Sequence, residues 1–395
     1  MESQQVSFRV AKDDLAHAVT WVARSLPNRV TQPVLRAIVI TADDNGLEFA
    51  GFDYEVSTKV RISAEVIEPG RIAVAGKLIA EITNTLPNKP VEISLDGSKV
   101  ELRCGSSRFE LPQIPLDDYP QLPTLPEVTG SIDPQLFTRA TTQVASAAGK
   151  DDTLPMLTGV NMEITGRRLR LVATDRFRLA VRNLEWKPVS ESITAKLLIP
   201  AKTLLENARS VDPHLTDPVE LAVGTGDEVG ADGLFGVHAE NRETTTRLLD
   251  AEFPNIQPLL PKVHNAIATV EIAPLQEAIR RVSLVTERNS QIRMRFTAEE
   301  LTLSAGGSDA GHAEETLPCA FRGRDEMVIA FNPAYLKDGL SVIDTDRVVF
   351  GFVESSRPAI LLPEPEELPE QTEDGTYATP DTDFLYLLMP VRLPG

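Results

Sequence analysis

The 395-residue sequence has little cysteine, few aromatic residues and no long apolar run. Its two cysteines, Cys104 and Cys319, stand far apart in the sequence and in no metal-binding or redox spacing, which fits a reducing cytosol better than a disulfide framework. No apolar run approaches the roughly 18 residues of a membrane span, and the residues that follow Met1 are polar. We therefore expect neither secretion nor membrane insertion.

Positive charge is also scarce, with 39 Lys and Arg residues against 58 Asp and Glu residues and a formal net charge of −19. A simple nucleic-acid binder usually carries a basic surface, so this balance counts against one. The run from Pro363 to Asp381 has seven carboxylates and no basic residue, which predicts a solvated loop. The length itself suggests two to four domains of roughly 100 to 200 residues, each able to bury most of its unfolded surface.

Motifs of common enzymes are missing as well. The sequence has no Gly-x-x-x-x-Gly-Lys-Ser/Thr phosphate loop and no His-Glu-x-x-His zinc motif, and its five histidines are scattered. Asp53, Asp151 and Asp152 are candidate acid-base or metal-binding carboxylates, but they lack partners at ligand spacing. We therefore expect no catalytic residues, no metal site and no cofactor.

What the sequence does contain is a repeat. Pro33–Ile40 followed by Leu47–Asp53 predicts two strands joined by a tight turn. The pattern returns 122 residues later, from Pro33 to Pro155, and then a third time in a more diverged form. The second and third copies cover Pro155–Val160 with Leu169–Asp175, and Ile292–Phe296 with Leu301–Ala305. Such self-similarity indicates one folding unit that occurs three times.

Each copy also predicts a helix before and a helix after these strands. The expected helices cover residues 12–25, 76–86, 134–150, 200–210, 274–289 and 333–344. The result is a threefold α+β repeat of about 130 residues per unit, with domains at 1–127, 128–262 and 263–395. Repetition alone is equally compatible with three independent binding modules or with an enzyme that has duplicated halves.

The distribution of charge favours a binding protein. The six expected helices carry 11 basic and 8 acidic residues, a net charge of +3, so the rest of the chain carries −22. An acidic protein that places basic side chains on its helices is suited to a surface that faces a polyanion. Lys and Arg residues are also common on helices simply because they are well solvated there. The argument therefore rests on the summed charge of the six helices and not on any single residue. The candidates are Arg24, Lys77, Arg139, Lys150, Lys202, Arg209, Arg280, Arg281, Arg288 and Lys337.

Five segments make the sequence recognisable: Gly51–Ser57, Asp152–Gly159, Ala173–Val181, Phe331–Tyr335 and Leu388–Leu393. Together they resemble the β sliding clamps of bacterial DNA polymerase III, and the resemblance covers essentially the whole chain. Met-Pro-x-Arg-Leu near the end and Ala-Thr-Asp-x-x-Arg-Leu-Ala in the second repeat are specific in combination, although either alone would be weak.

The resemblance implies three tandem copies of a DNA-clamp domain in each chain. Two such chains would close head to tail into a homodimeric ring of six domains, with helices lining the hole and sheets forming the outer wall. Such a clamp is not an enzyme; it encircles duplex DNA without sequence specificity and makes the replicative polymerase processive. The ring also answers the objection from negative charge, because topology holds the clamp and weak phosphate contact lets it slide.

By the same resemblance, the partners are duplex DNA, a second copy of the chain, the replicative polymerase, the clamp loader, translesion polymerases, ligase and mismatch-repair proteins. The proteins would bind through short extended peptides similar to Gln-Leu-x-Leu-Phe. The implied location is cytoplasmic, at replication forks on the nucleoid, with no membrane partner. Two alternatives stay open: a clamp paralogue that acts as a regulator or as an antibiotic-resistance copy, and a DNA-processing enzyme with duplicated domains.

The resemblance also implies a pocket for the partner peptides. Its apolar floor would consist of Leu157, Thr174, Leu179, Pro254, Leu259, Leu387 and Met389. The groove would be completed by Gly159, Arg178, Asn332, Tyr335, Pro390, Val391, Arg392 and Leu393. At the rim, Arg176-Phe177 and Leu154-Pro155 differ from residues that family members often carry.

Two further sets of residues follow from the resemblance. Arg29, in the loop after the first helix, matches a family position that contacts the duplex. Ile82, Phe109, Leu111 and Leu284 match positions in the joint between the two chains. Phe109 and Leu111 alternate along one expected strand, so strand addition across the joint is a reasonable mechanism.

Overall fold

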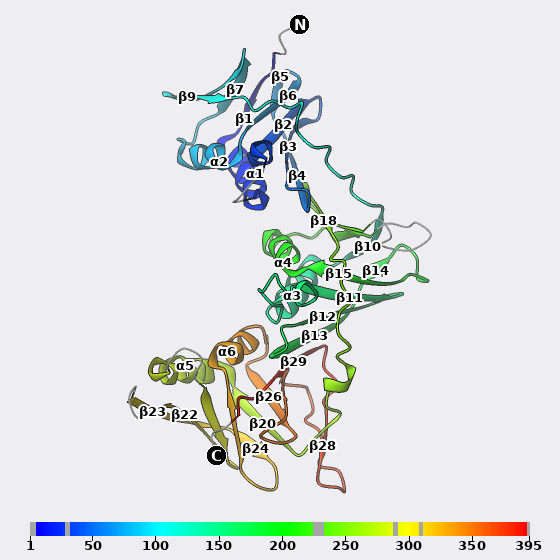
Figure 1. Ribbon diagram of the computed structural model, residues 1–395, viewed down its shortest axis with the longest axis vertical. Helices are drawn as coiled ribbons and strands as arrows, with labels where there is room; N and C mark the ends of the chain where they lie inside the picture. The colour runs from blue at the N-terminus through cyan, green and yellow to red at the C-terminus, as the bar shows by residue number, and fades with distance from the viewer. Residues whose placement is uncertain (1–4, 28–31, 224–232, 287–290, 308–310, 393–395) are drawn as a thin grey trace. The chain divides into compact units, whose positions relative to one another are not determined.

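The computed structural model describes residues 5–27, 32–223, 233–286, 291–307 and 311–392, and the chain forms two compact units. Unit 1 comprises residues 1–134, 188–190 and 211–248, and unit 2 comprises residues 135–187, 191–210 and 249–395. Arg29, Arg288 and Leu393 lie outside the described residues. Antiparallel strands and six α-helices make up the described part of the chain (Figure 1).

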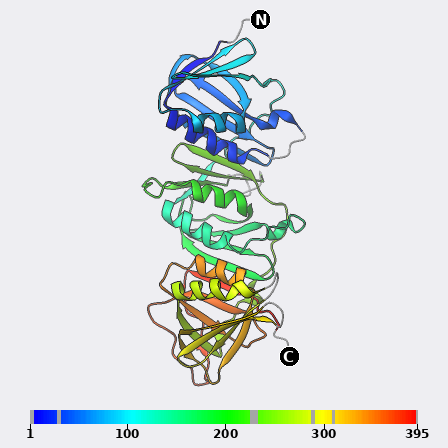
Figure 2. The same ribbon diagram turned by 90° about the vertical axis from the view of Figure 1, so that its left-hand side faces the viewer.

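Unit 1 contains helices α1 (Lys12–Ser25) and α2 (Gly76–Thr85), which pack side by side (Figure 2), and two antiparallel sheets. The five-stranded sheet has the order β5 (Glu65–Glu68), β1 (Ser7–Val10), β7 (Val91–Asp96), β8 (Lys99–Cys104), β9 (Ser107–Pro112). The nine-stranded sheet has the order β14 (Lys187–Pro188), β10 (Val128–Ile132), β16 (Val219–Ala222), β17 (Leu234–Ala239), β18 (Arg242–Arg247), β4 (Val56–Ile62), β3 (Gly46–Phe52), β2 (Ala37–Asp43), β6 (Gly70–Ala75).

Unit 2 contains helices α3 (Pro134–Ala145), α4 (Ala201–Ser210), α5 (Ile272–Val282) and α6 (Pro333–Ser341). Its large sheet has the order β15 (Thr194–Pro200), β11 (Gly159–Thr165), β12 (Arg168–Thr174), β13 (Arg178–Glu185), β29 (Phe384–Leu388), β27 (Ala359–Pro363), β26 (Arg347–Phe352), β20 (Ala266–Glu271), β24 (Ala320–Arg322). A second sheet has the order β23 (Gly311–Pro318), β22 (Glu300–Gly307), β21 (Ile292–Phe296), β25 (Met327–Phe331). A short pair joins β19 (Val263–His264) to β28 (Tyr377–Ala378).

The first helix of each repeat buries the same stripe of side chains. In α1 the buried positions Leu15, Ala18, Val19 and Val22 follow the spacing i, i+3, i+4, i+7, which places them on one face of a helix. The same spacing recurs in α3 at Phe137, Ala140, Thr141 and Val144, and in α5 at Leu275, Ala278, Ile279 and Val282. Burial of one large aliphatic side chain contributes about 1.5 to 3 kcal/mol. The expected threefold α+β repeat is confirmed.

Neighbouring repeats join by antiparallel strand pairing, at two places that we call seams. The first seam, in unit 1, pairs β4 with β18, with Val60 opposite Arg242 and Val56 opposite Thr246. The second seam, in unit 2, pairs β13 with β29, with Arg182 opposite Phe384 and Arg178 opposite Leu388. The hairpins β3–β4 and β12–β13 align Leu47 with Ile62 and Leu169 with Leu184. Val60 lies two residues before Ile62, and Arg182 lies two residues before Leu184, so each seam begins at the same position relative to its hairpin. The two seams therefore have the same register.

Some boundaries differ from those expected. Pro33–Arg36 and Pro155–Leu157 form 3₁₀ turns, not the first residues of strands, because proline lacks an N–H for a strand ladder and its φ suits a helical first turn. Helix α3 ends at Ala145, five residues before the expected end, and continues as tight turns in which Ala147 N bonds Val144 O and Ala148 N bonds Ala145 O. Helices α5 and α6 also end before their expected last residues. One 3₁₀ turn follows α5 (Ser283–Val285), and another precedes the third repeat of the chain (Gln257–Leu259).

The acidic segment, residues 363–381, is partly ordered, not simply a solvated loop. Its strand β28 pairs with β19, and Thr379 N donates to Lys262 O at 2.9 Å. His264 Nε2 lies 2.8 Å from Thr379 Oγ1, and the ring is 1% exposed. Burial lowers the pKa of His264 to about 4 because the charged imidazolium loses its hydration there.

This pKa predicts a loss of stability in mild acid. Below about pH 6.5 the unfolded chain binds a proton at His264 that the folded chain does not, so unfolding becomes easier as pH falls toward 4. Between pH 6.5 and 5 the contribution amounts to about 2 kcal/mol at most. Denaturant unfolding at a series of pH values measures it. His264→Gln should flatten the pH dependence in this window; equal curves for His264→Gln and wild type would contradict the assignment.

Candidate functional site

The turn between β12 and β13 is built to present a side chain outward. Asp175 Oδ1 accepts hydrogen bonds from the backbone N–H groups of Phe177 at 3.0 Å and Arg178 at 3.1 Å. Thr174 Oγ1 donates to Arg178 O at 2.6 Å, and Arg176 has a φ of 80°, in the left-handed region. The tight turn leaves the Phe177 ring 50% exposed.

Arg178 connects this turn to α6 and β29. Its guanidinium is 5% exposed, donates to Asp175 Oδ2 at 2.9 Å and to Asp338, and lies 4.5 Å from the centre of the Tyr335 ring. Burial by itself lowers the pKa of Arg178, but its interactions with Tyr386, Asp338 and Asp175 outweigh burial and leave that pKa raised. The cation is therefore permanent and holds three elements of unit 2 together.

The chain after β29 runs beside the same turn. Met389 N donates to Phe177 O at 2.9 Å, and Val391 N donates to Ala330 O at 2.8 Å. The Met389 and Val391 side chains are 38% and 37% exposed, and Phe177 stacks on Tyr335 with ring centres 5.9 Å apart. Phe177, Met389 and Val391 thus form an exposed apolar patch on ordered backbone. We call these three residues, with Tyr335, the apolar patch.

A buried cluster supports the patch. Leu179 and Leu387 are opposite each other on the second seam and are each 1% exposed. They pack in one cluster with Phe253 and Ile256, whose segment also carries Pro254 and the 48% exposed Leu259. Gly159 is required nearby, since a Cβ there would lie 2.7 Å from Leu198 Cδ1 and 2.9 Å from Leu249 Cδ1.

The expected pocket residues that the structure describes all belong to unit 2 and differ in exposure. Leu157, Thr174, Leu179 and Leu387 are buried, and Leu179 and Leu387 belong to the supporting cluster. Pro254, Leu259, Met389, Val391 and Arg392 are exposed, while Asn332, Tyr335 and Pro390 are half-buried. Asn332 caps α6, where its Oδ1 accepts from Ala334 N at 2.9 Å. Sequence reasoning did not identify Asp338 and Tyr386, because their role depends on contact with Arg178 across more than 150 residues.

All described members of the basic set are exposed. With the observed helix bounds, the six helices carry nine basic and six acidic residues, so the expected net charge of +3 is confirmed. Lys150 lies beyond the end of α3. Acidic partners partly neutralise three of the set: Arg139 pairs with Asp344 at 3.3 Å, Arg280 with Glu277 at 2.7 Å, and Arg281 with Glu315 at 2.6 Å.

The four expected joint residues fall in two classes. Ile82 and Leu111 are 8% and 5% exposed and pack in the core of unit 1, so their side chains offer little surface. Phe109 is half-buried on β9, the edge strand of its sheet, and Leu284 is 83% exposed in the 3₁₀ turn after α5. Of the four expected joint residues, Phe109 on the β9 edge and Leu284 are therefore the ones whose side chains are accessible.

The candidate carboxylates have structural roles. Asp53 Oδ1 accepts from the N–H groups of Glu55 and Val56, and Asp151 Oδ1 accepts from Thr153, so each organises a turn. Asp152 is exposed. In the part of the chain that the structure describes, no group of three or more His, Cys, Asp or Glu side chains has an arrangement that would hold a metal ion. None of the described helices is long and apolar enough to cross a bilayer.

Comparison with known proteins assigns the whole chain. Models of the DNA polymerase III beta subunit match residues 6–123 with the N-terminal domain, 131–255 with the central domain and 257–373 with the C-terminal domain. The beta sliding clamp of Streptomyces coelicolor is 44% identical over 391 residues, 99% of this chain and 100% of the relative. A beta sliding clamp homolog from Streptomyces muensis, GriR, is 40% identical and covers 98% of this chain and 99% of its own length.

Solved structures agree. The DNA polymerase sliding clamp of Bacillus subtilis matches with a TM-score of 0.86 and 26% identity, and covers 99% of this chain and 100% of its own. The sliding clamp of Pseudomonas aeruginosa bound to griselimycin matches with the same TM-score and identity, and covers 98% and 100%.

The chain therefore belongs to the DNA polymerase III β-subunit family. Its function is that of a DNA sliding clamp, a non-catalytic processivity factor in DNA replication. The three tandem clamp domains expected from the sequence are confirmed, and family membership speaks against the DNA-processing enzyme as an alternative.

Proposed function

We propose that the apolar patch is the site at which this clamp tethers its protein partners through short extended peptides. The observation that carries the proposal is that Phe177, Met389 and Val391 are exposed yet held by backbone hydrogen bonds above a buried cluster. Exposed apolar side chains on rigid backbone bind at a low entropic cost. The remaining residues of the expected pocket surround this patch and supply edge groups for the peptide backbone and its glutamine.

Several partners share this one site in our proposal. The replicative polymerase, the clamp loader, translesion polymerases, ligase and mismatch-repair proteins each offer a peptide similar to Gln-Leu-x-Leu-Phe and compete for the patch. Leu and Phe side chains enter against Met389, Leu259 and Val391, and the stacked Phe177–Tyr335 pair forms one wall. The clamp acts in the cytoplasm, at replication forks on the nucleoid.

We infer that two copies close into a ring of six domains through a third seam with the register of the first two. In the hairpin β22–β23, Leu301 is opposite Leu317, as Leu47 is opposite Ile62. Strand β23 therefore corresponds to β4 and β13, and β9, which ends its repeat, corresponds to β18 and β29. Both β23 and β9 are edge strands in their sheets, and unpaired edges favour association.

The register of this third seam gives specific pairs. Glu315 corresponds to Val60 and Ser107 to Arg242, so these two residues should be opposite each other in different copies. Arg108 then lies opposite Glu314, Glu110 opposite His312, and Phe109 opposite Ala313. Arg108 and Glu314 are of opposite charge, and cross-strand pairs of opposite charge stabilise a sheet by roughly 0.2 to 1 kcal/mol each.

The basic residues of the helices face the DNA in this proposal, with Arg29 among them. Their modest net charge, partly neutralised by Asp344, Glu277 and Glu315, keeps phosphate binding weak. Each additional neutralised phosphate would steepen the salt dependence by about 0.9 log unit and add friction to sliding. Encirclement then supplies the residence time that affinity does not.

A clamp paralogue with a regulatory or resistance role is the second candidate, favoured by the 40% identity to the homolog GriR. Size and DNA retention separate it from a replicative clamp. A replicative clamp is a dimer that a loader places on DNA, whereas a repurposed monomer would sediment as a single chain and would not be retained.

Truncation of Met389 tests the peptide site. Met389→Ala should weaken binding of a Gln-Leu-x-Leu-Phe peptide by about 1 to 3 kcal/mol, a tenfold to hundredfold loss, because a central apolar contact disappears. Isothermal titration calorimetry measures the affinity. Val263→Ala is the matched control, because Val263 is 53% exposed on β19 of the same unit. If both variants bind like the wild type while remaining dimeric, the site lies on another surface.

Charge reversal tests the third seam. Arg108→Glu or Glu314→Arg alone places like charges opposite each other in both joints of the dimer and should weaken dimerisation by about 2 kcal/mol, or thirtyfold. The double variant Arg108→Glu/Glu314→Arg should recover most of the lost affinity. Leu284→Lys should also weaken dimerisation, and the double variant should not relieve that loss. Sedimentation velocity over a concentration series measures the constant. Arg9→Glu, a reversal on β1 away from the β9 edge, is the control; failure of the double variant to recover would rule out this register.

The topology of the DNA tests encirclement. Clamp placed by a clamp loader on closed circular DNA should survive moderate salt, and linearising that DNA with a restriction enzyme should release it within minutes. Changing Arg24 and Arg29 to Ala should shorten residence only modestly, because contact is weak by design. Gel filtration of the labelled clamp with the DNA measures retention. Equal, salt-sensitive binding to circles and linear fragments would remove the topological mechanism.

A further inference from the structure

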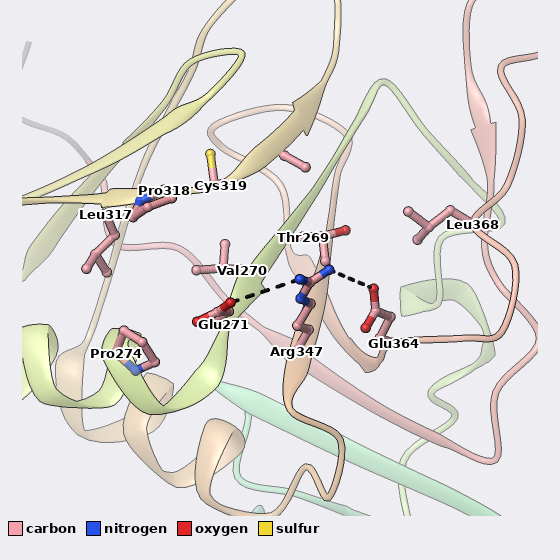
Figure 3. Close-up of a pocket in the computed structure, with 11 residues that line it drawn as sticks. Thr269, Val270, Glu271, Pro274, Leu317, Pro318, Cys319, Arg347, Glu364 and Leu368 are labelled. Carbon is pink, nitrogen blue, oxygen red and sulfur yellow. Dashed lines mark ion pairs between the residues drawn. The ribbon is translucent and has the colours of Figure 1, made fainter.

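A cavity of about 310 Å³ lies in unit 2 (Figure 3), and none of its lining residues is a residue of the proposed peptide site. Its walls are mainly apolar: Leu317, Pro318 and Cys319 lie on one side and Leu368 on the other, with Val270 between them. On one side Arg347 lies between two carboxylates, 4.0 Å from Glu271 and 3.7 Å from Glu364. The volume is within the range of small-ligand sites.

The repeat explains why this cavity exists. Cys319 follows Leu317 by two residues, and its N–H donates to Glu299 O at 2.9 Å. At the corresponding position of the second repeat, Trp186 follows Leu184 by two residues, and its N–H donates to Arg167 O at 3.0 Å. Glu299 precedes Leu301 by two residues, as Arg167 precedes Leu169, so the two backbones are equivalent.

The two side chains at this position differ greatly in size. Trp186 is 3% exposed, and its indole Nε1 donates to Gly166 O at 2.8 Å, so the indole fills its own site. The thiol of Cys319 lies near the equivalent turn, 3.6 Å from Thr297 O, but is far smaller than an indole. The third repeat therefore has an open space where the second has an aromatic ring.

Charge indicates what would enter this space. One guanidinium between two carboxylates leaves the wall with a net negative charge, and the acidic segment that supplies Glu364 and Leu368 contains no basic residue. A cationic group beside an aromatic ring would find apolar contact inside the cavity and opposite charge at its rim. An acidic partner would be repelled.

We propose that this cavity is a second binding site, which takes an aromatic side chain, of tryptophan size, from a basic segment of a partner protein. The incoming ring replaces the indole that Trp186 supplies in the second repeat. Neighbouring Lys or Arg residues of the partner lie against Glu271 and Glu364. None of the residues that line this site belongs to the apolar patch, so both can be occupied at once.

Cys319 provides the readout. Burial raises the pKa of its thiol to about 11, so alkylation by N-ethylmaleimide should accelerate about tenfold per pH unit between pH 7 and 10, and pH 9 gives a convenient rate. Cys104 is 1% exposed and should stay unlabelled. With the full-length protein, the peptide acetyl-Lys-Trp-Lys-amide at millimolar concentration should slow labelling of Cys319 at least threefold, measured by mass spectrometry. Acetyl-Lys-Ala-Lys-amide and acetyl-Glu-Trp-Glu-amide should protect much less.

Variants complete the test. Cys319→Trp should fill the cavity and abolish peptide binding in calorimetry, while Cys319→Ala keeps the cavity open and should bind like the wild type. Glu364→Lys should lose the protection because it reverses a charge at the rim while leaving the apolar residues of the wall unchanged, and so decides the matter if Cys319→Trp does not fold. Met389→Ala should leave protection intact, which separates this site from the peptide site proposed above.

Three outcomes would overturn the proposal. Equal protection by the Ala and Trp peptides would mean that charge alone binds. Equal protection by the acidic and basic Trp peptides would mean that the carboxylates play no part. Protection that rises with protein concentration, in the absence of peptide, would mean that a second copy of the chain covers the cavity.

Discussion

Antiparallel pairing between the last strand of one repeat and the fourth strand of another is the interaction on which the rest of the structure depends. Within the described residues it occurs twice, at β4–β18 and β13–β29, with one register. Backbone hydrogen bonds fix the spacing and direction of the strands, so whichever side chains the repeats carry are delivered to fixed relative positions. The apolar patch is a product of the second seam, since Met389 continues β29 directly beside the turn that opens β13.

The side chains at the two seams differ sharply. Ser57, Thr58, Thr244, Thr245 and Thr246 line the first seam and are all buried. At matching positions the second seam has Leu179, Ala180, Tyr386, Leu387 and Leu388. At the position of Met389 the first seam has Arg247, whose Nε donates to Tyr54 O at 2.9 Å. One backbone construction thus gives a polar seam and an apolar one, which accounts for why the proposed peptide site is at the second seam and not at the first.

Much of this was available from the sequence, because its signals are local. The helical stripes in α1, α3 and α5 and the hairpins follow from periodicity and turn residues. The residues of the peptide site came only from resemblance to clamps, since Leu179 and Leu387 look like ordinary core residues. What the sequence did not reveal depends on distant contacts. These are the ion pair of Arg178 with Asp338, the contact of His264 with Thr379 in the acidic segment, and the cavity beside Cys319. The last of these depends on the size of a side chain compared with its equivalent in another repeat, which periodicity does not report.

The acidic segment occupies an informative place in the repeat. It connects β27 to β29, the strand pair that corresponds to β17–β18 and β8–β9, where only Glu240-Asn241 and Gly105-Ser106 make the turn. Twenty residues lie between Pro363 and Phe384, against two in each equivalent turn, and the pairing of β27 with β29 is kept. Loop closure costs grow only slowly with length, so a hairpin of this kind accepts added sequence cheaply. The tip at Asp374-Gly375 is therefore a natural place to graft a fluorophore or an affinity tag, where it would report on the clamp during replication and leave both seams undisturbed.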